Sequence, residues 1–187
     1  GSTSNNQFFF FFFLSNKSAF VELLNKLDAQ YAFLGNVGTQ FYFAADKDAP
    51  KRRVICIDIQ NPSPENWKVI IPESTMKLES ASIVGKWILC EYLQDAKSLV
   101  TVFDLSGKKI RDVELPGLGA TTGFGGRMDQ SETFYEYTSF NHPRTIFRYD
   151  LLSGKSTLFK KPNIPFDPNL FETKQVFFKS KDGTRVP

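Results

Sequence analysis

A repeat of 46 residues constrains the fold of this chain more than any other feature of its sequence. Three apolar segments read VICIDI, VTVFDL and IFRYDL, and they align without gaps. Each carries an aspartate before its last residue, and consecutive aspartates, Asp58, Asp104 and Asp150, are 46 residues apart. A fixed period of this length indicates one supersecondary unit used several times, with neighbouring units burying each other's apolar faces.

Each repeat contains four short apolar or aromatic stretches separated by turn residues, which is typical of an all-β protein. The aspartate ends the third stretch, and the sequence LSGK stands twice between the third and fourth, where a Ser-Gly turn belongs. The stretches that open the repeats are Tyr31–Leu34, Ala81–Val84 and Ala120–Phe124. Four strands in about 46 residues match a propeller blade. The sequence therefore predicts an all-β fold, a partial β-propeller of about three and a half four-stranded antiparallel blades.

The period also sets the expected boundaries of the units. Counting back one period places the phenylalanine run Phe8–Leu14 on the third strand of an earlier blade and Ala19–Leu24 on its fourth. We expect the chain to divide into residues 1–2 (a tag remnant), 3–27 (outer strands of an incomplete blade), three blades at 28–72, 73–116 and 117–163, and an exit segment at 164–187. Propellers close with about four to eight blades. The chain is therefore expected to be a piece of a larger protein or one member of an assembly of pieces.

The charge, the apolar runs and the cysteines of the chain indicate which partners and which cellular compartment to expect. The net charge is +3, and the tight basic clusters are Lys51–Arg53 and Lys160–Lys161, so no nucleic-acid partner is expected. The longest apolar run has seven residues, well short of a membrane span, and no membrane partner is expected. Cys56 and Cys90 lie within apolar strand patterns without metal-ligand spacing, which indicates small buried side chains in a reducing compartment. We expect a cytoplasmic location, with the periplasm as the alternative.

No residue pattern in the chain indicates catalysis. The single histidine, His142, precedes a proline and is expected in the turn between two strands of the last blade. The glycine run Gly117–Gly126 lacks the spacing and the following helix of a dinucleotide site. It is better explained as a first blade strand whose glycines allow close backbone approach near the central channel. We predict no catalytic residue, no metal ligand and no cofactor in this chain.

The last twelve residues, VFFKSKDGTRVP, contain a strong hairpin signal at Asp182-Gly183. The sequence predicts a strand over Gln175–Lys179 and a second strand over Thr184–Pro187. The first of these is expected to close the propeller half.

Several segments of the chain resemble the later blades of the prolyl oligopeptidase family. The resemblance extends from about Tyr31 to Pro187 and is most specific in YTSF and in the closing SKDGTRVP; it also includes NWKVIIPES, CEYLQDAKSLVTVFDLSG and ETFYEYTSFNHPRTIFRYDL. It implies a seven-bladed open propeller joined to an α/β-hydrolase domain with Ser, Asp and His, which cleaves short peptides after proline. The hairpin at Asp182-Gly183 would then be the junction to the hydrolase domain, and the propeller would restrict access to its active site. Thr184–Pro187 would be that domain's first strand, frayed or held only by the hairpin.

The same resemblance supplies one candidate substrate-binding residue and a set of partners. The position aligned with an outer substrate subsite is Phe12, and the alternative is a phenylalanine packed between blades. The implied partners are short proline-containing peptides, the catalytic domain and the remaining blades, and the unpaired edges predict self-association. A non-enzymatic propeller that binds proteins remains an alternative, although no Trp-Asp pair marks such repeats. An oligopeptidase specific for basic residues is a further alternative within the same superfamily.

Overall fold

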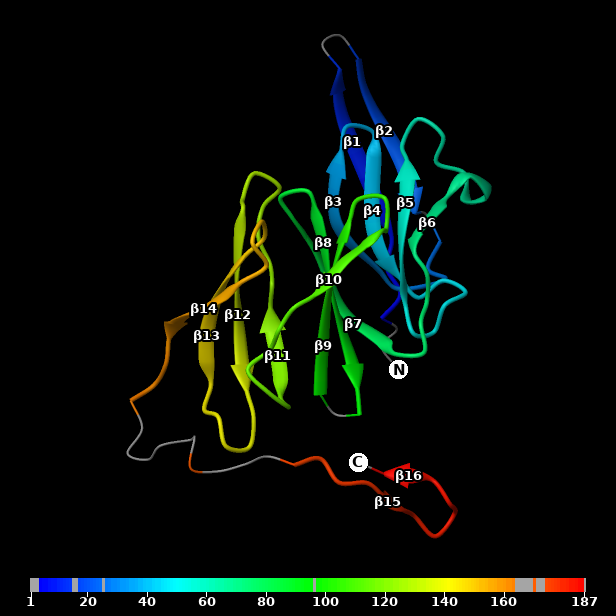
Figure 1. Ribbon diagram of the computed structural model, residues 1–187. Coiled ribbons are helices and arrows are strands. Elements are labelled where there is room, and N and C mark those ends of the chain that lie inside the picture. The colour runs from blue at the N-terminus through cyan, green and yellow to red at the C-terminus, as the bar shows by residue number, and fades with distance from the viewer. Residues whose placement is uncertain are drawn as a thin grey trace. The chain divides into compact units, whose positions relative to one another are not determined.

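The computed structural model describes residues 4–14, 17–24, 26–95, 97–163, 170 and 174–186, without the side chains of residues 9–22. Within this part the chain folds into strands β1 to β16, and Pro64–Asn66 forms a 3-10 helical turn (Figure 1). It forms two compact units, Gly1–Ala81 and Ser82–Pro187. The all-β prediction is confirmed.

The first unit contains a two-stranded hairpin followed by a four-stranded sheet. The hairpin pairs the phenylalanine run with the strand after it in antiparallel register. The sheet is an antiparallel meander in the order β3-β4-β5-β6. The bounds of these strands are β1 (Phe8–Leu14), β2 (Lys17–Leu24), β3 (Tyr31–Val37), β4 (Gln40–Ala45), β5 (Arg53–Asp58) and β6 (Lys68–Ile71).

The hairpin of the first unit packs against its sheet through a shared apolar core. Leu23 and Leu24 at the end of β2 belong to one buried cluster with Phe43 of β4 and Ile55 of β5. The rings of Phe8 and Phe43 meet edge to face, with centroids 5.3 Å apart. Each large apolar side chain buried in this way contributes about 1.5–3 kcal/mol to stability. The hairpin is therefore packed against the four-stranded sheet of the first unit, and its assignment to the outer strands of an incomplete blade stays a prediction.

The second unit contains two four-stranded sheets, in the orders β10-β9-β8-β7 and β11-β12-β13-β14. Strand β7 crosses the boundary between the units, so its last residues belong to the second one. The bounds are β7 (Lys77–Val84), β8 (Trp87–Gln94), β9 (Lys97–Asp104), β10 (Lys109–Asp112), β11 (Ala120–Gly123), β12 (Glu132–Thr138), β13 (Thr145–Asp150) and β14 (Ser156–Lys160).

The two sheets of the second unit share one hydrophobic core. Val84, Leu89 and Val102 from the first sheet form a buried cluster with Tyr135 and Tyr149 from the other. Strand β8 is buried over both faces from Ile88 to Tyr92, whereas β12 alternates, with its odd-numbered residues from 133 to 137 buried. This difference shows that the β7–β10 sheet is covered on both sides along β8, whereas the β11–β14 sheet is covered on one.

The repeated aspartates end the third strand of each blade with the same turn. Asp58, Asp104 and Asp150 each accept a hydrogen bond from the backbone N–H two residues later, at 3.0, 2.9 and 3.1 Å. Asp104 also accepts one from the Ser106 hydroxyl, and Asp150 one from the backbone N–H of Ser153. A short carboxylate that bonds its own backbone is a standard way to start a turn. The aspartate that repeats every 46 residues thus has a structural role: it starts the turn between β5 and β6, between β9 and β10, and between β13 and β14.

The predicted strands of the three repeats are confirmed, and the predicted exit strand is wrong in its extent. The closing hairpin consists of β15 (Phe178–Lys179) and β16 (Arg185–Val186), which pair only with each other among the described strands. Residues 174–177 have no ladder partner there and are not assigned to a strand. Among the described strands, β15 therefore joins no blade sheet, so the expectation that the exit strand closes the propeller half finds no support there. The expectation that the second strand is held only by the hairpin is confirmed as far as Val186.

Candidate functional site

A groove of about 570 Å³ lies in the second unit, near the ends of its strands. It lies among the β8–β9 turn, the segment that enters β11, the β12–β13 turn and the segment that leads to β15. Its lining residues are Asp95, Lys97, Leu118, Gly119, Ala120, Thr138, Ser139, Phe140, Lys174, Gln175 and Val176. We call it the connector groove, because residues 174–176 connect the last blade to the closing hairpin.

Three apolar side chains stand exposed along the connector groove. Phe140 is fully exposed at 102%, Val176 is 72% exposed and Leu118 is 38% exposed. Asp95, Lys97 and Lys174 supply charge around them. Apolar residues gathered in this way, with charged residues at the rim, are typical of a surface that contacts another protein part.

The β12–β13 turn that presents Phe140 is held by local hydrogen bonds. The backbone N–H of Ser139 donates to the His142 carbonyl at 2.9 Å, and the hydroxyl of Thr145 donates to the Pro143 carbonyl at 2.8 Å. The imidazole of His142 packs edge to face on Tyr137, with ring centroids 5.1 Å apart. His142 is therefore a turn residue, as predicted, and it fixes the turn while Phe140 projects from it.

Close backbone approach shapes the other wall of the connector groove. A Cβ at Gly119 would overlap the carbonyl oxygen of Thr138, and a Cβ at Gly123 would lie 2.8 Å from that of Phe134. Gly123 also has a φ of 119°, a backbone conformation that residues with a side chain rarely adopt. The middle of the glycine run thus forms the predicted first strand, β11, over Ala120–Gly123, and close backbone approach to β12 is confirmed at Gly119 and Gly123.

A buried carboxylate near this wall was not found from the sequence. Glu91 of β8 is 7% exposed and accepts a hydrogen bond from the Thr121 hydroxyl of β11. The Ser98 hydroxyl lies 3.4 Å from the same carboxylate and accepts the backbone N–H of Thr121 at 2.9 Å. The network ties the two sheets of the second unit together beneath the connector groove. A charged residue inside the apolar stretch WILCEYL was the signal that could have revealed it.

The segment after the groove is tied down at two points. The side-chain amide of Gln175 donates to the Asp95 carbonyl. The guanidinium of Arg185 lies 3.5 Å from the ring centroid of Phe177, a cation–π contact across the hairpin. In the hairpin turn, Asp182 accepts the backbone N–H of Thr184 at 3.0 Å. The turn predicted at Asp182-Gly183 is confirmed.

The described side chains offer no nucleophile or base in a catalytic arrangement. The Nδ1 atom of His142 lies 3.1 Å from the Pro143 carbonyl and 3.4 Å from the Thr145 hydroxyl. Burial raises the pKa of the Cys90 thiol to about 12, which keeps it protonated and unreactive. Among the residues that the structure describes, His, Cys, Asp and Glu form no group of three or more suited to a metal ion. None of the described helical segments is long and apolar enough to cross a membrane.

The candidate substrate residue Phe12 lies in β1, where its backbone pairs with Ala19. Its side chain lies outside the described part of the structure. The subsite role of Phe12 therefore stays a prediction.

Comparisons with known proteins identify the class to which the blades and the connector belong. Residues 1–162 match the family profile described as the N-terminal β-propeller domain of prolyl oligopeptidase. The fold is thus that of a peptidase propeller domain, and the chain belongs to the prolyl oligopeptidase family.

Several prolyl endopeptidases are similar to this chain over most of its length. The relative from Elizabethkingia miricola is 35% identical over 176 residues, covering 93% of this chain and 24% of the relative. The relative from Dictyostelium discoideum is 30% identical over 188 residues, covering 93% of this chain and 25% of the relative. The chain thus spans about a quarter of the length of the curated relatives that it matches.

Solved structures agree with this assignment. A prolyl endopeptidase from a study of inter-domain dynamics in catalysis and specificity superposes with a TM-score of 0.80 at 37% identity, covering 94% of this chain and 26% of that one. Prolyl oligopeptidase B from Galerina marginata, solved as the apo protein, gives a TM-score of 0.81 at 25% identity, and the match covers 92% of this chain and 25% of that one. The partial propeller predicted from the sequence is confirmed.

Proposed function

We propose that this chain is the access-controlling propeller part of a serine-type prolyl endopeptidase that cleaves short peptides after proline. The observation that carries the proposal is the match of residues 1–162 to the propeller of this family. The described sheets support a scaffold role, because each unit is built around an apolar core.

We call the longer prolyl endopeptidase that would contain this chain the parent protein. The bond-breaking chemistry belongs to a domain that follows the propeller in the parent protein. There a serine oxygen adds to the carbonyl carbon on the carboxyl side of proline, and a histidine takes its proton and passes it to the leaving amine. Water then hydrolyses the acyl-enzyme, which releases the peptide acid and restores the serine. None of these groups stands in a catalytic arrangement among the side chains that the structure describes, so the 187-residue chain should be inactive by itself. It contributes rigid walls that admit short peptides and exclude folded proteins.

The connector groove is the surface where the following domain meets these blades. Phe140 and Val176 would lose their exposure there, which is the usual fate of apolar side chains at a domain contact. Residues 174–176 line the same groove and lead directly into the closing hairpin, so the chain leaves the propeller on this side. The remaining blades would cover the exposed face of the β11–β14 sheet.

We place the parent protein in the cytoplasm. Cys56 and Cys90 are both free and buried, as expected for thiols kept in a reducing compartment. The partners proposed for the parent are short proline-containing peptides, and neither nucleic acid nor membrane is proposed as a partner.

A peptidase assay on the parent polypeptide and on the 187-residue chain tests the function. The parent should cleave a fluorogenic Gly-Pro reporter and a proline-containing peptide of about ten residues, but not a folded protein that contains proline. The 187-residue chain should cleave none of them. Cleavage after Lys or Arg instead of Pro would favour the basic-residue oligopeptidase. A parent protein without any peptidase activity would favour the hypothesis of a non-enzymatic propeller. Turnover by the 187-residue chain alone would overturn the proposal that catalysis belongs to the following domain.

A further inference from the structure

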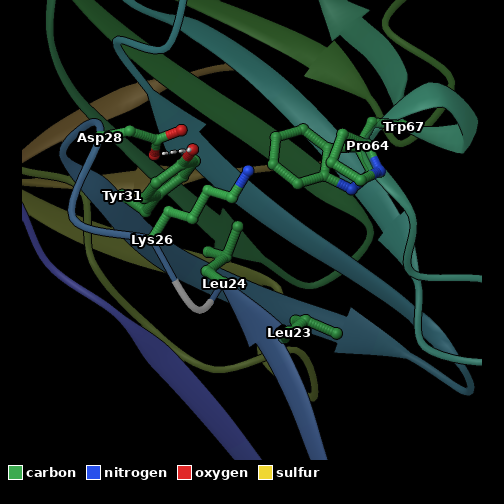
Figure 2. Close-up of a pocket in the computed structure, with 7 residues that line it drawn as sticks. All are labelled: Leu23, Leu24, Lys26, Asp28, Tyr31, Pro64 and Trp67. Carbon is green, nitrogen blue, oxygen red and sulfur yellow. Dashed lines mark hydrogen bonds between the residues drawn. The ribbon is translucent and has the colours of Figure 1, made fainter.

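A second depression, in the first unit, is unrelated to the connector groove. It has a volume of about 210 Å³ and lies where the end of β2, the start of β3 and the 3-10 turn before β6 meet (Figure 2). Its lining residues are Leu23, Leu24, Lys26, Asp28, Tyr31, Pro64 and Trp67. We call it the Trp67 pocket. Leu23, Leu24 and Tyr31 are buried at 5%, 4% and 2% exposure, so the base of the pocket is firmly packed.

The walls of the Trp67 pocket are apolar and partly aromatic. The rings of Tyr31 and Trp67 stand edge to face, with centroids 6.1 Å apart. The indole N–H donates to the Pro62 carbonyl at 2.9 Å, so Trp67 offers the pocket its ring and not a hydrogen bond. An apolar cavity of about 150 Å³ is enough to hold benzene. A pocket of this size and lining therefore accommodates one ring-sized apolar group.

The charges at the rim of the pocket are unevenly balanced. The carboxylate of Asp28 is already engaged, by Lys47 Nζ at 3.0 Å and by the Tyr31 hydroxyl at 3.1 Å. Lys26 has no ion pair with any carboxylate in the described part of the chain. Figure 2 shows its side chain extending across the pocket toward Trp67. The pocket thus combines an apolar interior with one positive charge that no carboxylate among the described side chains pairs with.

We propose that the Trp67 pocket binds a small organic acid with a ring-sized apolar body. The body lies against Trp67, Pro64 and the leucine base, and the carboxylate pairs with the ammonium group of Lys26. A neutral molecule of the same shape would leave Lys26 without a counter-ion, and a cation would meet it with like charge. The site makes no use of the proposed peptidase chemistry, so either proposal can fail without the other.

Fluorescence of Trp67 gives a direct test on the 187-residue chain. The chain has two tryptophans, so a Trp87→Phe background leaves Trp67 as the single reporter. N-acetyl-L-phenylalanine should change its emission in a saturable way, and the uncharged N-acetyl-L-phenylalanine amide should bind about three- to fivefold more weakly, the effect of one exposed ion pair. Lys26→Gln in the same background should lower the affinity for the acid to that for the amide. Lys26 is exposed, so the variant should keep the unfolding midpoint.

The matched control is Lys86→Gln. Lys86 Nζ lies 5.9 Å from the ring centroid of the other tryptophan, Trp87, and does not line the pocket. This variant should bind the acid as the background does. Equal affinity for acid and amide, an unchanged affinity in Lys26→Gln, or no saturable response to the acid would each overturn the proposal.

Discussion

The hydroxyl of Thr121 donates a hydrogen bond to the buried carboxylate of Glu91 and so joins the first strand of one blade to the second strand of the blade before it. A buried charge is tolerated only where polar groups replace the water that it has lost. The network of Glu91, Ser98 and Thr121 meets this requirement in the interior of the second unit, where the surrounding cluster is apolar. The contact therefore specifies how the two sheets are aligned, in addition to the apolar packing between them.

Replacing Thr121 with valine should destabilise the chain by about 1–3 kcal/mol. Valine has nearly the shape of threonine but cannot donate to Glu91, which leaves the buried carboxylate less well satisfied. Urea unfolding followed by circular dichroism measures the loss. Thr122→Val is the control, because Thr122 is the exposed neighbour on the same strand, and it should change the free energy of unfolding by less than about 0.5 kcal/mol. Equal effects of the two substitutions would contradict a role for the carboxylate.

The repeated aspartates should make the chain sensitive to acid. Hydrogen bonds within each turn hold the pKa of all three carboxyls below the ordinary value: from the backbone N–H of Gln60 to Asp58, from the Ser106 hydroxyl to Asp104 and from the backbone N–H of Ser153 to Asp150. A carboxyl whose pKa is lower in the folded chain stabilises it above the unfolded pKa of about 3.9. This stabilisation is lost as the pH falls through the folded value.

Asp104→Asn tests this linkage. The variant should lose stability at pH 7, where the charged carboxylate of the wild type accepts its hydrogen bonds, and the difference from the wild type should shrink toward pH 3. Free energies of unfolding at both pH values give the comparison. Asp129→Asn, an exposed residue outside the repeat, should show a smaller dependence. A gap between wild type and Asp104→Asn that is the same at pH 3 and pH 7 would exclude the turn carboxylate as the source.

Much of the fold could be predicted from the sequence, because each blade repeats the same local signals. The aspartate before Ile59, Leu105 or Leu151 marks the end of a third strand, and the apolar stretches on either side give its neighbours. The contact between Glu91 and Thr121 could not be predicted in this way, because it joins residues 30 positions apart on different sheets. The exit strand was predicted too long because Gln175–Phe177 has strand composition, whereas a strand also needs a partner, and the described sheets offer none. Phe140 was not singled out, because sequence alone does not show which aromatic residue in a turn stays uncovered.

Gly119→Ala should destabilise the second unit by about 1–3 kcal/mol. The added Cβ would overlap the Thr138 carbonyl and the ring of Tyr137, which are fixed by pairing and by burial. Gly125→Ala is a close control, because a Cβ there would meet no atom within 4 Å. Thermal unfolding of both variants measures the difference. If both shift the midpoint equally, loss of glycine flexibility and not close approach would be the cause.

The chain should self-associate through its exposed last blade. Leu158 and Phe159 on the edge strand β14 are 54% and 62% exposed. The ring of Phe159 packs on the exposed ring of Phe134, with centroids 4.9 Å apart. Unpaired edges with exposed apolar residues promote pairing between chains. Sedimentation velocity should show concentration-dependent association that Phe159→Lys reduces. Ile110→Lys on the edge strand β10 should reduce it less, because that strand is otherwise polar. A monodisperse monomer at high concentration would rule the association out.

Phe140 should matter in the parent protein and not in the isolated chain. Because its side chain is fully exposed, Phe140→Ser should change the unfolding free energy of the 187-residue chain by less than about 0.5 kcal/mol. In the parent, loss of an apolar anchor between domains should cost about 1–2 kcal/mol of docking energy. The connector at residues 174–176 should then be cut several-fold faster in limited proteolysis. Leu152→Ser is the control, since Leu152 is also exposed but lies outside the connector groove. Equal cleavage rates in Phe140→Ser, Leu152→Ser and the wild type would mean that no domain docks on this turn.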